Sequence, residues 1–168
     1  LPGNCLRPAL RSGGHPLAAG LQAATGEIVL LVDPWTRLAP DALAALVGAI
    51  EGPQALAYAD VDHVSGHGRR RCAPFFKPSV PGAMLWSLDL LAPVTAFNRS
   101  LAATAGAAIE GDAPALGLRL ELAGTAPRSC HGPRGRAHRE LAPKAEPTDW
   151  RLVGAAAVAA VRRHVATH

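Results

Sequence analysis

Aromatic residues are scarce in this chain: they make up 4% of its 168 residues, although 49% of the residues are hydrophobic. A core with few aromatic rings must be built from Ala, Leu and Val, and Ala-rich interiors favour helices packed closely on a sheet. A chain of this length buries roughly 70% of its unfolded surface, which is enough for a real core. The composition therefore predicts a single domain of the α/β or mostly helical class, and it disfavours an aromatic-lined β-sandwich.

Lysine is also scarce. Only Lys77 and Lys144 are lysines among 17 basic residues, although the formal net charge is +4. The arginines are scattered, and no aromatic residues are interleaved with them as a groove for single-stranded nucleic acid requires. We therefore expect no nucleic-acid partner.

The chain lacks the patterns of an exported or membrane-spanning protein. Its three cysteines, Cys5, Cys72 and Cys130, form no Cys-x-x-Cys pair, so neither a zinc site nor a disulfide framework is indicated. The start has no basic region followed by an apolar one. The longest apolar stretch, 152–161, is about half of the ~20 residues that a membrane-spanning helix needs. We expect a cytoplasmic protein with no transmembrane segment, at most peripheral at the inner face of the membrane.

What is present is an alternation of strand-like and helix-like segments. The run 27–32 is apolar without alternation, which is typical of a strand covered on both faces, as in a parallel sheet. We predict an α/β fold with a mixed, mainly parallel sheet flanked by helices. Residues 1–140 form the domain, 141–147 a linker and 148–168 a C-terminal amphipathic helix. Strands are predicted at 27–32, 54–58 and 94–97, helices at 16–25, 40–52, 100–106 and 114–122, and an irregular segment at 74–81.

Acidic residues follow two of the predicted strands. Asp33 ends the run 27–32, and Asp60 and Asp62 follow the strand 54–58. In open α/β sheets, ligands bind beyond the carboxyl ends of the strands. These three aspartates are therefore the first candidates for a site.

The segment 25–33, which reads Thr-Gly-Glu-Ile-Val-Leu-Leu-Val-Asp, is the first of a series of short segments along nearly the whole chain. Together these segments resemble bacterial family 2 glycosyltransferases that build surface polysaccharide. Segment 25–33 is similar to the family strand that begins with Gly-Glu and ends in the metal-binding Asp-x-Asp motif. Each similarity is short, but the segments follow one another in family order. The others are residues 38–43, 58–62, 68–70, 76–78, 98–106, 118–120, 123–124, 131–134 and 138.

The resemblance implies a partial GT-A fold that lacks its N-terminal nucleotide-binding strands. It implies transfer of a sugar from a nucleoside diphosphate, with UDP expected, to a hydroxyl of a glycan or lipid-linked acceptor. A divalent metal, Mg²⁺ or Mn²⁺, would stabilise the leaving diphosphate, and a carboxylate would take the acceptor proton. The C-terminal helix is similar to a segment that leads to a second transferase domain in longer relatives, so such a domain is an expected partner.

The resemblance also implies roles for particular residues. Asp33 and His138 are the expected metal ligands. Asp33, Asp60, Asp62 and Lys77 are expected to bind the nucleotide sugar. Against these roles stands a bland interpretation. Asp33 would cap a helix or hydrogen-bond a loop, and Asp60 and Asp62 would be surface acids near a turn. Lys77 would be a basic loop residue, and His138 a solvated histidine in an Arg-rich loop.

Two acidic positions of the family pattern are absent. Residues 34–37 read Pro-Trp-Thr-Arg where the family has further acids, so one metal carboxylate is missing. The position of the general base falls on an alanine in 112–115, where Asp112 or Glu110 could substitute. Trp35 is expected to pack against the protein, with sugar stacking as the alternative.

These departures leave two functions open. The first is a glycosyltransferase, or part of one, acting in surface polysaccharide assembly. The second is a catalytically inactive GT-A-like module that binds a partner domain, a sugar or a nucleotide. An unrelated basic α/β binding domain is a third, and it would bind nucleic acid with a steep dependence on salt.

Overall fold

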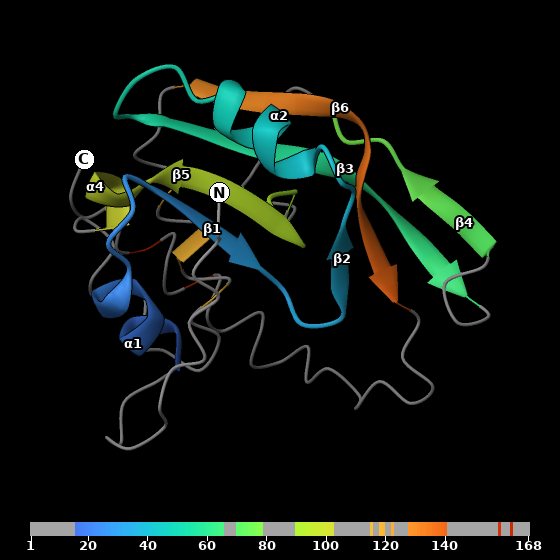
Figure 1. The fold of residues 1–168 in the computed structure, drawn as a ribbon, viewed down its shortest axis with the longest axis horizontal. Helices are drawn as coiled ribbons and strands as arrows, with labels where there is room; N and C mark the ends of the chain where they lie inside the picture. Colours follow the sequence, from blue (N-terminus) through green and yellow to red (C-terminus); the bar gives the residue numbers. More distant parts are fainter. Residues whose placement is uncertain are drawn as a thin grey trace.

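The computed structural model describes residues 16–65, 70–78, 90–102, 115, 118–119, 122, 128–140, 158 and 162. A six-stranded sheet runs in the order β1-β5-β3-β6-β2, with β4 paired to the second half of β3 (Figure 1). The helices are α1 (Pro16–Ala23), α2 (Ala42–Gly48) and α4 (Arg99–Ala102). The strands are β1 (Ile28–Val32), β2 (Thr36–Leu38), β3 (Ala55–Ser65), β4 (Arg70–Phe75), β5 (Val94–Asn98) and β6 (Arg128–Glu140).

The expectation of an α/β fold with a mixed sheet is confirmed, but the sheet is not mainly parallel. Among the described strands, β3 and β6 run parallel, whereas β1–β5, β3–β5, β3–β4 and β2–β6 are antiparallel. An apolar run such as 27–32 indicates coverage on both faces. Parallel strands are commonly covered in this way, but antiparallel strands with helices on both sides satisfy the same pattern. The burial pattern therefore does not fix the strand direction.

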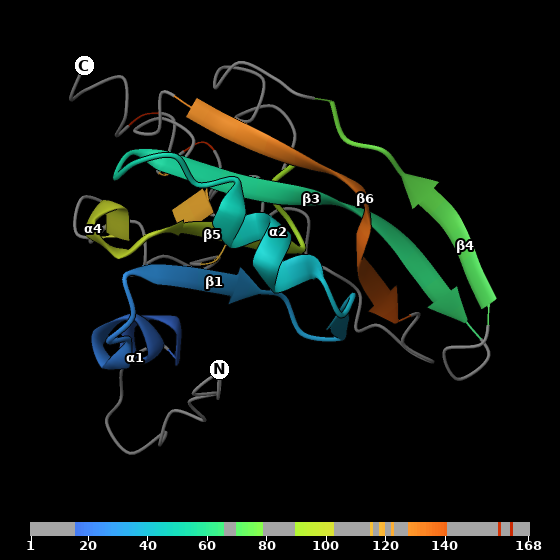
Figure 2. The same cartoon turned by 45° about the horizontal axis from the view of Figure 1, so that its top comes forward.

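Helical residues cover both faces of the sheet. Because side chains alternate along β3, Ala57 and Ala59 face α2 and pack with its Leu46. Leu56 and Tyr58 point to the opposite side, which we call the α4 face, where Leu101 of α4 packs against them. Figure 2 shows α2 across one face of the sheet, with α1 and α4 near the end where β1 begins.

The α2 face is built from small side chains, as the composition predicts. Small residues let a helix approach the sheet closely, and full burial of Leu46 contributes about 1.5–3 kcal/mol. The fully buried alanines on this face are Ala57, Ala59, Ala96 and Ala137.

The structure differs from the strand predictions in β3, β4 and β6, and it also contains the short strand β2, which was not predicted. The predicted strand 54–58 continues as β3 to Ser65, so Asp60 and Asp62 lie within it rather than beyond its end. Part of the segment predicted to be irregular belongs to β4, an edge strand, where a proline such as Pro74 is tolerated. β4 is also bulged: its register against β3 shifts next to Ala73, which has a φ of 46°. β6 was not predicted, because its Gly, Pro and Arg residues hide any apolar alternation.

Several predictions fall on residues outside the described part. They include the base candidates Glu110 and Asp112 and the linker 141–147. From the predicted C-terminal helix, Val158 and Arg162 are described, and both are helical and exposed. In the described part of the chain, no helix is long and apolar enough to cross a membrane.

Candidate functional site

The α4 face changes from apolar to polar along β3. Leu56 and Tyr58 are fully buried in the apolar cluster, and the next side chains on the same face are Asp60 and Asp62, which are also buried. Buried carboxylates must be paired or hydrogen-bonded, because taking an unpaired charge out of water costs several kcal/mol. Each of these acids therefore has to find partners on neighbouring elements. We call this region, defined by Asp33, Asp60, Asp62, Arg71, Lys77, Arg119 and His138, the polar end of the α4 face.

Asp33 lies just past the end of β1, at the level of Asp60 in the sheet. Its N–H donates to the carbonyl of Pro93 at 2.8 Å, and its Oδ1 accepts a hydrogen bond from Nη1 of Arg119 at 2.9 Å. The two side chains are 15% and 7% exposed, so the pair is largely buried. Helical residues Leu118 and Leu122 pack in the apolar cluster, and this packing carries Arg119 to the acid.

Asp60 and Lys77 fix the chain that follows β4. The backbone N–H of Lys77 donates to Oδ1 of Asp60 at 2.9 Å, and Nζ of Lys77 donates to the carbonyl of Ala92. The same Nζ lies 5.7 Å from the centre of the Tyr58 ring, within the range of a cation–π interaction. The Tyr58 hydroxyl donates to the carbonyl of Pro78 at 2.7 Å. Both Asp60 and Lys77 are buried, so their first effect is to hold residues 77–78 against β3.

Asp62 is held by two basic side chains. Its Oδ1 lies 2.6 Å from Nδ1 of His138, and its Oδ2 accepts a hydrogen bond from Nε of Arg71 at 2.5 Å. The Asp62 side chain is 5% exposed, His138 19% and Arg71 61%. Burial alone would raise the pKa of Asp62. The hydrogen bonds and charges of His138 and Arg71 outweigh that effect and lower its pKa below its usual 3.8.

The lowered pKa of Asp62 predicts a loss of stability in acid. A carboxyl group with a lowered folded-state pKa stabilises the fold fully above its unfolded pKa, and this contribution disappears as the pH falls from 3.8 through the lowered value. At pH 7, we expect Asp62→Asn to lower the free energy of unfolding by about 1 to 2 kcal/mol. Urea denaturation at pH 7, 5 and 3 should show the two proteins converging in acid, and a difference that stays constant or grows would contradict this assignment.

A row of charged residues crosses three strands at Asp62. His138 is the register partner of Asp62 across β3–β6 and of Arg37 across β6–β2. Register partners project their side chains from the same face, so Arg37, His138 and Asp62 stand side by side. Arg71 reaches the row from β4 through its contact with Asp62.

Trp35 is exposed, so the expectation that it packs against the protein is wrong. It lies in the turn between β1 and β2, is 68% exposed and has a φ of 65°. A bulky residue in this left-handed region is an outlier that costs about 1–3 kcal/mol. The alternative role, sugar stacking, stays a prediction.

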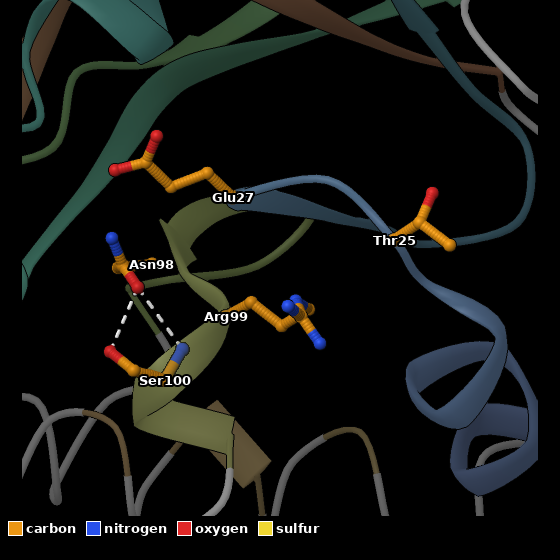
Figure 3. A pocket seen from close by; sticks show the side chains of 5 residues that line it. All are labelled: Thr25, Glu27, Asn98, Arg99 and Ser100. Carbon is orange, nitrogen blue, oxygen red and sulfur yellow. Dashed lines mark hydrogen bonds between the residues drawn. The ribbon is translucent and has the colours of Figure 1, made fainter.

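An open hollow lies at the opposite end of β1. It has a volume of about 420 Å³ and is lined by Thr25 and Glu27 before β1 and by Asn98, Arg99 and Ser100 where β5 meets α4 (Figure 3). Asn98 accepts hydrogen bonds from the backbone N–H and the hydroxyl of Ser100, and Nε of Arg99 donates to the carbonyl of Gly26. The hollow contains none of the residues predicted to form the site.

The two predicted metal ligands have other partners. Arg119 binds Asp33, and His138 binds Asp62 through Nδ1. Within the described ranges, no three His, Cys, Asp or Glu side chains are grouped to hold a metal ion. Mg²⁺ and Mn²⁺ need several oxygen ligands, and a guanidinium beside Asp33 repels a cation. As arranged, these residues do not fit a divalent metal, and the metal stays a prediction for titration to test.

The polar end includes Arg71 and Arg119, for which the sequence predicted no role. Arg119 belongs to a segment that resembles the family, but the sequence did not indicate that it would pair with Asp33. Arg71 follows two other arginines in a segment that reads as a polar turn. The register of β4 against β3, which the sequence did not show, brings Arg71 within reach of Asp62.

The fold and the site define an α/β domain whose mixed sheet has a polar, ion-paired end on one face. The chain matches no protein-family model, and the comparisons with curated proteins and with solved structures also give no match.

Proposed function

We propose that the chain is a glycosyltransferase-like domain. It would transfer a sugar from a nucleoside diphosphate sugar, with UDP the expected nucleotide, to an acceptor hydroxyl in surface polysaccharide assembly. The ordered similarity of its segments to family 2 glycosyltransferases and the polar end of the α4 face support this proposal together. Three finer assignments belong to the same proposal: a partial GT-A fold, a cytoplasmic location, and an acceptor that is a glycan or is lipid-linked.

One observation carries the proposal. The residues expected to bind donor or metal come from distant parts of the sequence, yet they lie on one face and at one end of the sheet. Asp33 leaves β1, Asp60 and Asp62 lie on β3, and His138 lies on β6, with Lys77 bound to Asp60. Motifs placed by chance would be scattered over both faces and both ends.

A second candidate is the inactive module that binds a nucleotide, a sugar or a partner domain. The contact between Arg119 and Asp33 favours it, because it neutralises the carboxylate that the metal would need. Packing residues can persist in a domain after its chemistry is lost. The two candidates differ in whether bound donor is turned over.

Calorimetric titration with UDP tests the proposal. We expect wild-type protein to bind UDP and Asp33→Ala to bind it at least tenfold more weakly, since loss of a charge-assisted contact costs about 1.5–3 kcal/mol. Each titration is run with EDTA and with Mn²⁺, which tests the metal prediction directly. Glu27→Ala, at the hollow, is the matched control because it also removes one carboxylate.

Absence of UDP binding under both conditions would contradict the proposal. Binding without release of UDP from UDP-sugars, in the presence of glycan acceptors, would favour the inactive module. Equal weakening by Asp33→Ala and Glu27→Ala would show that the loss is not specific to the polar end, because removal of a negative charge by itself favours binding of an anion.

A further inference from the structure

A buried carboxylate and a histidine ring meet at the polar end of the α4 face. Oδ1 of Asp62 lies 2.6 Å from Nδ1 of His138, and Oδ2 accepts a hydrogen bond from Nε of Arg71. The lowered pKa of Asp62 keeps it ionised at neutral pH, where a carboxylate can only accept hydrogen bonds. Nδ1 of His138 therefore carries the proton of this contact, and in the neutral ring Nε2 is left as the basic nitrogen.

Nε2 of His138 points away from Asp62, on a ring that solvent reaches. The His138 side chain is 19% exposed, whereas that of Asp62 is 5% exposed. In the part of the chain that the structure describes, the buried polar side-chain atoms without a hydrogen-bond partner are Oγ1 of Thr36 and Nδ1 of His63. Nε2 of His138 is not one of these sealed atoms. A substrate hydroxyl can therefore approach this nitrogen from solvent.

The carboxylates of the polar end are already engaged. Asp33 accepts a hydrogen bond from Arg119 at 2.9 Å, and Asp60 is buried and accepts a backbone N–H. Both oxygens of Asp62 are occupied as well. Among the described residues of this region, Nε2 of His138 is therefore the group best placed to take a proton from a hydroxyl.

We propose that His138 is the general base of the proposed glycosyl transfer and that Asp62 is the residue that positions it. In this step the acceptor oxygen forms a bond to the anomeric carbon of the donor. The bond from that carbon to the diphosphate oxygen breaks, and its electron pair leaves with UDP. The acceptor proton passes to Nε2 of His138, which later releases it to solvent. The charge of Asp62 stabilises the imidazolium that forms. The inference rests on the proposed function.

Two arginines near His138 oppose the imidazolium, but more weakly than Asp62 favours it. Asp62 is buried and contacts the ring directly. Arg71 contacts only the other oxygen of the carboxylate, and its side chain is 61% exposed, so solvent and salt screen its charge. Arg37, the register partner of His138 on β2, is exposed too. The direct, buried contact therefore decides which form of the ring is favoured.

Nitrogen-15 NMR of the imidazole rings tests the geometry without a substrate. At a pH where the ring is neutral, we expect His138 to carry its proton on Nδ1. Asp62→Asn should move the proton to Nε2, because an amide can donate a hydrogen bond to Nδ1. A wild-type ring that carries its proton mainly on Nε2 would overturn the inference, whatever the activity of the chain.

Turnover tests the role itself. It is measured as UDP released from UDP-glucose, UDP-galactose or UDP-N-acetylglucosamine, with a mixture of methyl glycosides as acceptors. We expect His138→Ala to lower kcat by about 100- to 10,000-fold, to leave UDP affinity within twofold, and to regain part of its activity when imidazole is added. His63→Ala removes a histidine from the residue next to Asp62, on the opposite face of β3, and should leave kcat within twofold. Thermal unfolding of each variant checks that it is folded.

The outcomes separate the inference from the proposed function. Turnover that is unchanged in His138→Ala would overturn the inference and leave the proposed function supported. Loss of UDP binding in a folded His138→Ala variant would place the ring in donor binding and would also overturn the inference. A wild-type chain that releases no UDP from these donors would contradict both the transfer and the base.

Discussion

Replacing Arg119 with leucine is expected to lower the free energy of unfolding by about 3 kcal/mol, because it leaves the largely buried carboxylate of Asp33 without its partner. Breaking a buried ion pair from one side is costly, since the remaining charge keeps its desolvation penalty. For a protein of this size, the midpoint of thermal unfolding should fall by roughly 6–12 °C. Chemical denaturation and calorimetry measure both values.

Two controls make this prediction specific. Arg99→Leu removes an exposed arginine and should change stability by no more than about 0.5 kcal/mol. The double variant Asp33→Asn with Arg119→Leu removes both charges and should recover part of the loss, because replacing both partners is far less costly than replacing one. A single variant as stable as wild type would show that the Arg119–Asp33 contact does not hold the two segments together.

Replacing Asp60 with alanine should destabilise the fold by a similar amount, about 3 kcal/mol. The change removes the Asp60 oxygen that accepts a hydrogen bond from the backbone N–H of Lys77, and both residues are buried. Asp60→Asn keeps a hydrogen-bond acceptor of the same shape and should cost about 1 kcal/mol. Urea denaturation of both variants measures the difference.

The pair of Asp60 variants separates support of the fold from ligand binding. Equal stability of wild type and Asp60→Ala would contradict the assignment of Asp60 and Lys77 as a buried clamp. UDP titration of Asp60→Asn, the variant expected to stay well folded, then measures whether the carboxylate charge also contributes to the donor site predicted from the sequence.

Local patterns predicted much of the fold. The apolar run 27–32 became β1, the predicted helix 40–52 became α2, and the predicted strand 94–97 became β5. These elements have local sequence signals: apolar runs mark the strands, and a proline near the start and a glycine near the end mark the helix. β6 and the length of β3 were missed because they depend on pairing with distant strands, and Gly132 and Pro133 within β6 give the opposite local signal.

For the candidate site too, local sequence predicts some features, and contacts between distant residues decide the others. The sequence predicts that Asp33 and Asp60 lie near strands, and the family resemblance indicates His138 as a site residue. It cannot show that His138 meets Asp62 or that Arg119 meets Asp33, because those contacts join residues 76 and 86 positions apart. The bland interpretation of His138 as a solvated residue also fails for the same reason, since its ring is bound to Asp62 and mostly buried. Long-range register, rather than residue type, decides which charges meet.

The central claim is that a nucleotide diphosphate binds at the polar end of the α4 face. Two-dimensional ¹H–¹⁵N NMR of this 17.3 kDa chain with added UDP tests it most directly, because the perturbed amides report where the ligand lies. We predict saturable shifts at Asp33, Arg37, Asp62, Arg71 and His138. Shifts confined to Thr25, Glu27 and residues 98–100 would move the site to the hollow at the other end of β1, and an unchanged spectrum would contradict the account.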